Sequence, residues 1–338
     1  LMGSESGFRQ DETTNKFVSL TLLRLYNTVS VFSIEVFCTF AGKTGRMILI
    51  ADSGSTKTDW IIWTGDEGSD KVISTQGINP FHQSEDIIFN VLETELKPAL
   101  KESIRNAELS ESFDIIREVT SVAFYGAGCT ADLSIKVCKA LSKSFPLANV
   151  EVQSDLLGAA RATCGHHAGI VCILGTGANS CLYNGTEIVE NVPPLGYILG
   201  DEGSGAVLGK LFLNGIFKGG LSKEIRDSYL AWSRLSYSDI INKVYRQPLA
   251  NRYLASISKF IHANLDKAEL EELVLSNFAN FFENNITRYS DASKHSLSAV
   301  GGVAAVYESQ LRKCAKSYGY SVIKVLASPI DGLIEYHR

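Results

Sequence analysis

Short apolar runs alternate with helical patterns along most of the chain. Residues 84–100 carry apolar side chains at helical spacing and start at Ser84, which can cap a helix. Strands are expected at 47–52, 58–63, 71–76, 119–128 and 149–155, and further helices at 130–145, begun by Thr130, and 155–164. Because strands and helices are interleaved, the pattern predicts α/β layers with a mixed sheet.

The opening strand–turn–strand pattern recurs at residues 169–185 (GIVCILGTGANSCLYNG), with Gly54 and Gly177 in equivalent places. A duplication of this length predicts two similar α/β lobes. After a glycine-rich helix entry, residues 221–290 are almost wholly helical in pattern. The chain then returns to strand, Gly-Gly turn, helix, strand and a short final helix. A cleft between two such lobes is the expected ligand site.

The first 46 residues do not share this pattern. A polar stretch precedes a mostly apolar one that Arg24, Asn27 and Glu35 interrupt, so it is a poor membrane span. It also lacks the short length, basic start and small-residue cleavage site of a signal peptide. We expect Met47 to be the natural start and residues 1–46 to be a non-native or disordered extension.

The net charge of −5 provides no basic field that would attract nucleic acid or an anionic membrane. We therefore expect neither as a partner. The seven cysteines form no Cys-x-x-Cys pair, and several lie in apolar runs. Reduced, buried thiols are typical of a cytoplasmic protein.

Three strands run into glycine turns, and glycine lets backbone amides approach an oxyanion closely. One such turn is an ordinary feature, but three in a duplicated fold favour a clamp for nucleotide phosphates. None has the spacing of a Walker A or dinucleotide-binding motif. The turns are Gly54-Ser55-Thr56, Gly175-Thr176-Gly177 and Gly301-Gly302.

These turns resemble the two phosphate motifs and the adenosine motif of the actin/sugar-kinase/heat-shock ATPase superfamily. With GINPFH, SDLLGAARA and LGDEGSG, residues 47–338 resemble its N-acetylglucosamine kinase-like branch, which is also grouped with BadF/BadG/BcrA/BcrD-type ATPases. The resemblance implies two ribonuclease H-like lobes, of the actin-like ATPase type, with an interlobe cleft. We expect one lobe at 47–153, joined by the C-terminal helix 329–338, and the other at 154–328 with a helical insertion at 221–290.

The resemblance implies an ATP-dependent kinase that phosphorylates a hydroxyl, the 6-hydroxyl, of an amino sugar such as N-acetylglucosamine or glucosamine. ATP and Mg²⁺ are the implied cofactors, the amino sugar is the implied partner, and a homodimer is expected. Two alternatives remain open: an ATPase that activates another enzyme, and a non-catalytic sugar or nucleotide sensor. Activators of the first kind hold an iron–sulfur cluster with cysteines, and this chain has no close cysteine pair.

The resemblance also implies residue roles. Asp155 matches the catalytic base and Asp52 the carboxylate near Mg²⁺. The remaining matches fall into two sets: Gly54, Ser55, Thr56, Lys57, Gly175, Thr176, Gly177, Gly301 and Gly302 for the nucleotide, and Asn79, Asn179 and Asp201 for the sugar.

Several of these residues have simpler interpretations. Asp155 could cap the helix that follows Ser154, and Asp201 could cap the helix near Gly203. Lys57 and Asp59 could form an ion pair at a strand edge. One position departs from the family: Leu195 replaces a tryptophan that forms an aromatic wall for the sugar, so a stacking surface is lost.

Overall fold

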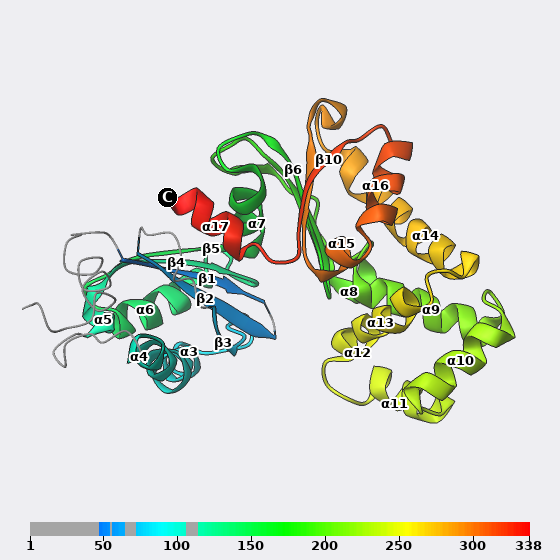
Figure 1. Ribbon diagram of the computed structural model, residues 1–338, viewed down its shortest axis with the longest axis horizontal. Coiled ribbons are helices and arrows are strands. Elements are labelled where there is room, and N and C mark those ends of the chain that lie inside the picture. The colour runs from blue at the N-terminus through cyan, green and yellow to red at the C-terminus, as the bar shows by residue number, and fades with distance from the viewer. Residues whose placement is uncertain (1–46, 55, 65–71, 106–113) are drawn as a thin grey trace, which may run out of the picture.

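The computed structural model describes residues 47–54, 56–64, 72–105 and 114–338. The expected extension at 1–46 lies outside the described residues, which begin at Met47. Two lobes, each built on a five-stranded mixed sheet, lie side by side (Figure 1). Among the described helices, none is both long and apolar enough to cross a membrane.

The two sheets have the same topology, as the internal duplication predicts. In each, the first two strands form an antiparallel hairpin and the first strand pairs in parallel with the fourth. The first sheet has the order β3 (Ile73–Gln76), β2 (Lys57–Trp63), β1 (Met47–Ser53), β4 (Val119–Gly126), β5 (Asn149–Ser154). The second has the order β8 (Ile188–Glu190), β7 (Ala178–Tyr183), β6 (Gly169–Leu174), β9 (Leu297–Val300), β10 (Val322–Leu326).

Helices cover the outer face of each sheet. On the first sheet they are α3 (Glu85–Val91), the π-helical turn η1 (Leu92–Leu96), α4 (Lys97–Arg105), α5 (Ile115–Glu118) and α6 (Ser134–Ser144). Ser84 caps α3 as the sequence predicts, since its side chain accepts a hydrogen bond from the Ile87 amide. The start expected for α6 was four residues early, because Thr130 instead begins a turn in which its carbonyl accepts from the Ser134 amide.

The second lobe carries most of the helices, and the stretch 221–290 is helical as predicted. They are α8 (Gly196–Leu199), α9 (Gly205–Lys218), α10 (Lys223–Ser233), α11 (Tyr237–Tyr245), α12 (Ala250–Ser256), α13 (Ser258–Ala263), α14 (Ala268–Asn284), η2 (Ile286–Arg288), η3 (Ala292–Lys294), α15 (Gly302–Val306) and α16 (Glu308–Ser317). Their apolar faces form one large core against the second sheet.

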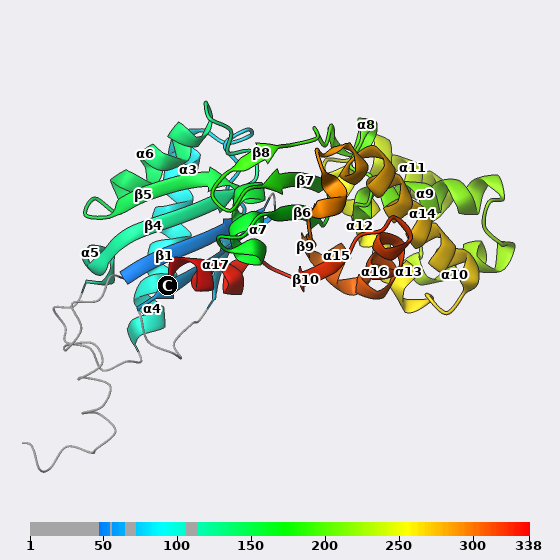
Figure 2. The same cartoon turned by 90° about the horizontal axis from the view of Figure 1, so that it is seen from above.

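Two helices join the lobes: α7 (Asp155–Cys164) and the C-terminal α17 (Ile330–His337). One side of α7 packs with α17 against the first sheet, and its other side packs against the second sheet. The two helices lie side by side between the sheets in both views (Figures 1 and 2). Because Asp155 is the first residue of α7, it lies where the two lobes meet.

Candidate active site

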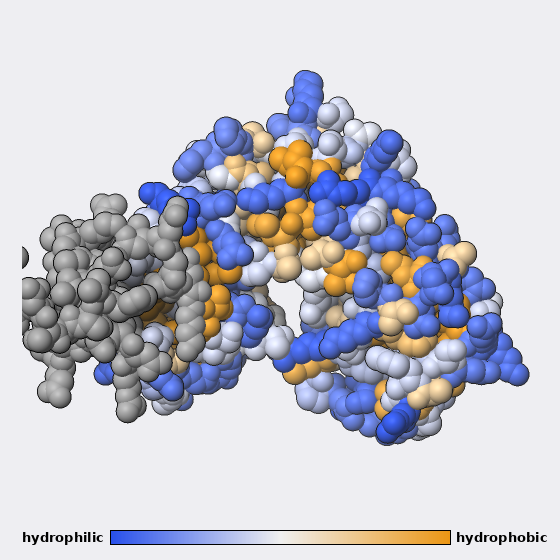
Figure 3. Space-filling model, in the orientation of Figure 1, coloured by the Kyte–Doolittle hydropathy of each residue, from blue (hydrophilic) through white to orange (hydrophobic). Residues whose placement is uncertain are grey.

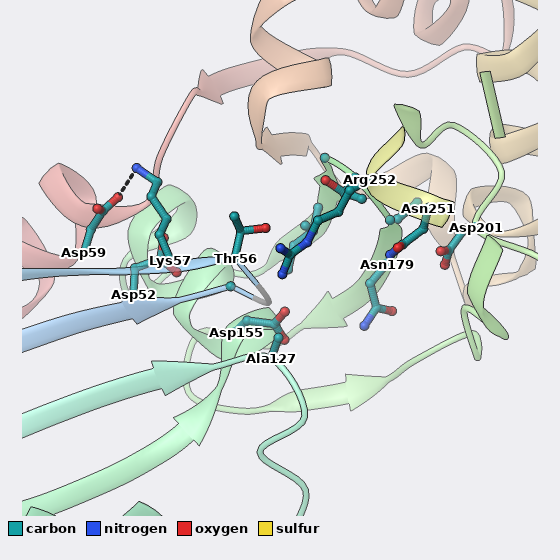
Figure 4. Close-up of a pocket in the computed structure, with 16 residues that line it drawn as sticks. Asp52, Thr56, Lys57, Asp59, Ala127, Asp155, Asn179, Asp201, Asn251 and Arg252 are labelled. Carbon is teal, nitrogen blue, oxygen red and sulfur yellow. Dashed lines mark hydrogen bonds and ion pairs between the residues drawn. The ribbon is translucent and has the colours of Figure 1, made fainter. Parts of the chain in front are cut away.

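A cleft of about 440 Å³ separates the two lobes, and both phosphate-type turns open into it. The space-filling view shows the hollow between the lobes (Figure 3). Its lining combines backbone-rich turns with carboxylates, amides and an arginine (Figure 4): Asp52, Gly54, Thr56, Lys57, Asp59, Ala127, Asp155, Ile173, Gly175, Thr176, Gly177, Ala178, Asn179, Asp201, Asn251 and Arg252. The structure therefore brings together most of the residues that the sequence singles out.

The first turn joins β1 to β2 and is closed by a hydrogen bond from the Gly54 amide to the Lys57 carbonyl, 3.0 Å long. Thr56 is exposed near the tip and lines the cleft, while Ser55 lies outside the described residues. Lys57 Nζ lies 2.6 Å from the Asp59 carboxylate, which also accepts from Ser74 Oγ at 2.6 Å. Lys57 thus forms the strand-edge pair and lines the cleft as well.

The second turn is built in the same way, with the Gly175 amide donating to the Gly177 carbonyl at 2.9 Å. Gly54 and Gly175 each follow the last residue of the first hairpin strand, so they are the equivalent pair. The predicted equivalence of Gly54 with Gly177 was therefore wrong by two residues. The start of α9 supports this turn, since the Gly205 amide donates to the Gly175 carbonyl and the Ala206 amide to the Thr176 carbonyl.

The Gly-Gly pair lies behind the second turn. Gly301 has a φ of 122°, and a Cβ there would lie 2.4 Å from the Leu174 carbonyl oxygen, so a side chain cannot fit. Gly301 also lines a rear pocket of about 220 Å³, together with Asp52, Asp155 and Pro329. Gly302 begins α15 and is not part of the lining of either pocket.

Asp155 is the first residue of α7 and faces the cleft. The cap of this helix is Ser154, whose Oγ accepts from the Leu157 amide at 3.2 Å. The capping role is therefore filled by the neighbouring residue, which weakens that interpretation of Asp155. Burial between the lobes raises the pKa of the Asp155 carboxyl, while hydrogen bonds from the Leu156 amide and its own amide oppose the rise.

Asp52 lies near the end of β1 in the same cleft. Its pKa is raised to about 7, mainly by burial and also by the nearby carboxylates of Asp155 and Asp59, against the opposing effect of Lys57. Buried carboxylates that repel one another fit a divalent cation, which would relieve the repulsion. Within the described ranges, no three His, Cys, Asp or Glu side chains gather as a complete metal site. This donor set suits Mg²⁺, which commonly takes one or two carboxylates and completes its shell with water and phosphate oxygens.

Asp201 and Asn179 lie on the second-lobe side of the cleft (Figure 4). Asp201 adopts a left-handed conformation with a φ of 56°, and its carboxylate lies against Gly177, where a Cβ would approach Oδ2 to 3.0 Å. Burial raises its pKa to about 6. The cap of α9 is Ser204, which accepts from the Val207 amide, so Asp201 is not needed as a cap. Asn179 Oδ1 accepts from the Asn191 side chain at 3.0 Å.

Asn79 is the predicted sugar residue that does not line the cleft. It lies in the turn after β3, where its side-chain Oδ1 accepts from the Phe81 amide at 2.9 Å and its backbone amide donates to Gln83 Oε1. Its side chain packs against Gly128, where a Cβ would approach Oδ1 to 2.3 Å. Because Ala127 does line the cleft, Asn79 supports the edge of the site from behind this loop.

The fold is similar to solved structures of known description. The chain shares 44% identity with a structure named as a putative N-acetylglucosamine kinase from Porphyromonas gingivalis, over 86% of this chain and 98% of that one, with a TM-score of 0.79. This chain belongs to the N-acetylglucosamine kinase-like family. A second structure, also named as a putative N-acetylglucosamine kinase, from Chromobacterium violaceum, is 13% identical over 88% of this chain and 100% of that one, with a TM-score of 0.65. No family model matches the chain, and no curated protein matches it significantly.

Membership of the N-acetylglucosamine kinase-like family confirms two predictions from the sequence. The resemblance to that branch is confirmed, as is the fold of two ribonuclease H-like lobes of the actin-like ATPase type. The position that departs from the family, Leu195, has a φ of 61° just before α8, and its side chain is 63% exposed. The substitution therefore leaves an exposed aliphatic side chain where a wall of the site was expected.

Two residues of this N-acetylglucosamine kinase-like protein were missed by the sequence reasoning. Asn251 and Arg252 line the cleft from α12, within the helical insertion. That stretch was recognised as helical but given no role, because it carries no glycine turn and no known motif.

Proposed function

We propose that this protein is an ATP-dependent kinase that transfers a phosphoryl group to the 6-hydroxyl of an amino sugar such as N-acetylglucosamine or glucosamine. One observation carries the proposal: two phosphate-type turns and the half-buried Asp155 line the same cleft. Phosphoryl transfer needs bound phosphates, an aligned hydroxyl and a group that accepts its proton. The names of the related structures support an amino sugar as acceptor.

The residues of the cleft suggest how this chemistry would proceed. The turns at Gly54–Thr56 and Gly175–Gly177 would hold the ATP phosphates through amides at their tips, because the Gly54 and Gly175 amides close the turns themselves. Mg²⁺ beside Asp52 would neutralise phosphate charge. Asp155 would accept the proton of the attacking hydroxyl, and its raised pKa makes it a stronger base than an exposed carboxylate.

The sugar would bind between Asp155 and the second lobe. Asp201 and Asn179 offer a carboxylate and an amide that can form hydrogen bonds with sugar hydroxyls. Asn79 would act at the edge of this pocket or after the lobes close, since it lies behind the Ala127–Gly128 loop. The exposed Leu195 would offer aliphatic contact in place of aromatic stacking.

The proposal is tested by measuring ADP release from Mg-ATP with a panel of N-acetylglucosamine, glucosamine, N-acetylmannosamine and glucose. We expect the fastest release with an amino sugar, and a product phosphorylated at the 6-hydroxyl by phosphorus NMR. Sugar-independent ATP hydrolysis would favour an ATPase that activates another enzyme. Saturable sugar binding without any ADP release would favour a sensor, and either result would overturn the kinase assignment.

A further inference from the structure

Arg252 projects into the interlobe cleft from the helical insertion. It lies on α12 and lines the cleft together with Thr56 and Asp155, which come from the other side. The close-up shows its guanidinium group directed toward the space between these two residues (Figure 4). A cationic side chain from the second lobe thus reaches the region where the two phosphate-type turns face the predicted base.

The position of Arg252 is fixed by tight helix packing. Helix α12 lies so close to α9 that a Cβ at Gly209 would come within 2.1 Å of the Leu254 carbonyl oxygen. One turn earlier, Gly205 lies against the Ala255 side chain, and its amide donates to the Gly175 carbonyl at 2.8 Å. Arg252 is therefore carried by a helix that is packed onto α9, and the first residue of α9 holds the second phosphate-type turn.

The balance of charged side chains in the cleft bears on the role of Arg252. Four carboxylates line it among the described residues, Asp52, Asp59, Asp155 and Asp201, together with two cations, Lys57 and Arg252. Lys57 forms an ion pair with Asp59. A nucleotide triphosphate would add further negative charge, so a cation close to the transferred group is needed to balance it.

The linings of the main cleft and the rear pocket indicate which part of a bound nucleotide Arg252 would contact. The rear pocket is lined by Gly301, Ser328 and Pro329, and Arg252 is not part of its lining. The main cleft is lined by both phosphate-type turns and Asp155, and by Asn179, Asp201 and Arg252 of the second lobe. Arg252 therefore lies beside the two turns that would hold the phosphates, and outside the pocket that contains Gly301.

We propose that Arg252 is a catalytic residue that binds the transferred phosphoryl group, supplied in cis by the helical insertion. The inference rests on the proposed kinase function. In the step, the sugar oxygen forms a bond to the γ-phosphorus while the bond from that phosphorus to the bridging oxygen breaks. The electron pair leaves with ADP and the hydroxyl proton passes to Asp155. Arg252 stabilises the charge on the equatorial phosphoryl oxygens, as a planar guanidinium suits them.

The test compares Arg252→Gln with Arg252→Lys and with Arg246→Gln, an exposed arginine of the same insertion that does not line the cleft. We expect Arg252→Gln to lower kcat by about a thousandfold. The lysine variant should fall between the glutamine variant and the wild type, since it keeps the charge but loses the planar group. Arg246→Gln should match the wild type, and all thermal midpoints should stay near that of the wild type.

A second measurement does not depend on sugar turnover. Calorimetric binding of a nonhydrolysable ATP analogue should weaken about tenfold in Arg252→Gln, while ADP binding changes less than about threefold, because only the analogue carries a γ-phosphate. Equal losses for both nucleotides, or no loss for either, would overturn the inference. If the wild type phosphorylates no sugar, the kinase assignment fails, and this binding difference still decides the role of Arg252.

Discussion

The Oγ atom of Ser53 lies 2.6 Å from Oγ1 of Thr58, and this buried hydroxyl pair connects the first phosphate-type turn to the loop that carries Asn79. Ser53 ends β1 and Thr58 lies near the start of β2, so the pair spans the base of the turn. Both hydroxyls accept from the Ile78 amide, at 3.0 and 3.2 Å, and Ser53 also donates to the Ile78 carbonyl. The nucleotide and sugar sides of the site therefore share one hydrogen-bond network.

We predict that Thr58→Val disturbs both sides of the site. Valine keeps the shape of threonine but cannot accept from the Ile78 amide or donate to the Gln76 carbonyl. Loss of a buried hydrogen-bonding partner should lower the free energy of unfolding by about 1–3 kcal/mol. The KM for the sugar should rise more than the KM for ATP, because the loop with Asn79 loses one of its hydrogen bonds and keeps those to Ser53, while Gly54 still closes the turn.

The matched control for this substitution is Thr94→Val, since Thr94 is exposed and its hydroxyl bonds only within its own helix. That variant should unfold at the same denaturant concentration as the wild type. If Thr58→Val were equally stable and kept both KM values, the hydroxyl pair would have no coupling role.

A second prediction concerns the contact between α7 and α17. Gly332 lies so close to α7 that a Cβ there would come within 2.2 Å of the Ala162 carbonyl oxygen. Since backbone cannot give way cheaply, Gly332→Ala should destabilise the protein by about 1–3 kcal/mol, despite the better helix propensity of alanine. It should also lower kcat, because α7 carries Asp155 at its first residue.

Gly220→Ala provides the comparison for Gly332→Ala, since the nearest atom to its Cβ would be 3.5 Å away, an ordinary contact. Chemical denaturation should show a midpoint close to that of the wild type. A stable and fully active Gly332→Ala protein would show that the two helices can separate without effect on the site.

The sequence could predict more of the fold than of the site. The first strand starts with an unbroken apolar run at residues 47–51, and the recurrence of the strand–turn–strand pattern at 169–185 predicted the duplicated topology, although Gly54 was paired with Gly177 and not with Gly175. The start of α6 was placed early because threonine is a good cap residue, and the actual turn uses the Thr130 backbone instead. Local preference alone cannot show which of two hydrogen-bonding patterns the surrounding structure favours.

The contribution of α12 could not be found in the sequence for a different reason. Arg252 reaches the cleft because α12 packs on α9 through Gly205 and Gly209, which are more than 40 residues earlier in the chain. Long-range packing of this kind leaves no periodic signal near the arginine itself. The Gly-turn residues were found because their chemistry is local, since amides of consecutive residues form the anion site.

A third prediction distinguishes two roles at the start of α7, Asp155 as the base and Ser154 as the helix cap. Asp155→Asn should lower kcat at least about a hundredfold, since an amide cannot accept the proton of the hydroxyl. Ser154→Ala should instead cost about 1 kcal/mol of stability, because it removes the side chain that accepts from the Leu157 amide. Steady-state kinetics and denaturation of the two variants test this division. Near-normal turnover in Asp155→Asn would remove this residue from the mechanism.

The raised pKa of Asp155 also predicts how stability depends on pH. In the unfolded chain its carboxyl has the ordinary pKa of 3.8, and burial raises that pKa in the folded protein. Below pH 3.8 the group is protonated in both states and burial carries no charge penalty. As pH rises from 3.8 to the folded pKa, the unfolded chain loses its proton while the half-buried native carboxyl keeps it, so this group destabilises the fold increasingly, and the effect levels off above the folded pKa. Asparagine is neutral throughout and avoids the penalty.

We therefore expect the thermal midpoint of ligand-free Asp155→Asn to exceed that of the wild type by a margin that grows as pH rises above 3.8 and levels off above the folded pKa. Differential scanning calorimetry across this range measures the margin. Glu335→Gln serves as the control, because that carboxylate is exposed on α17 and should give a margin that does not increase in this way. A margin for Asp155→Asn that shrinks with rising pH would contradict the assignment of a raised pKa.

The last prediction is that the lobes close on their ligands. The cleft takes Gly54 and Asp155 from one side and Gly175, Asp201 and Arg252 from the other, so a nucleotide and a sugar together would contact both lobes. Each ligand can stabilise a closed form only by as much as it binds that form more tightly. Sugar with a nonhydrolysable ATP analogue should therefore reduce the radius of gyration in small-angle scattering more than either ligand alone. ADP with sugar is the control, because it lacks the γ-phosphate that Arg252 would bind, and it should compact the protein less. An unchanged radius with sugar and analogue both bound at saturation would show that the cleft is already in its catalytic shape.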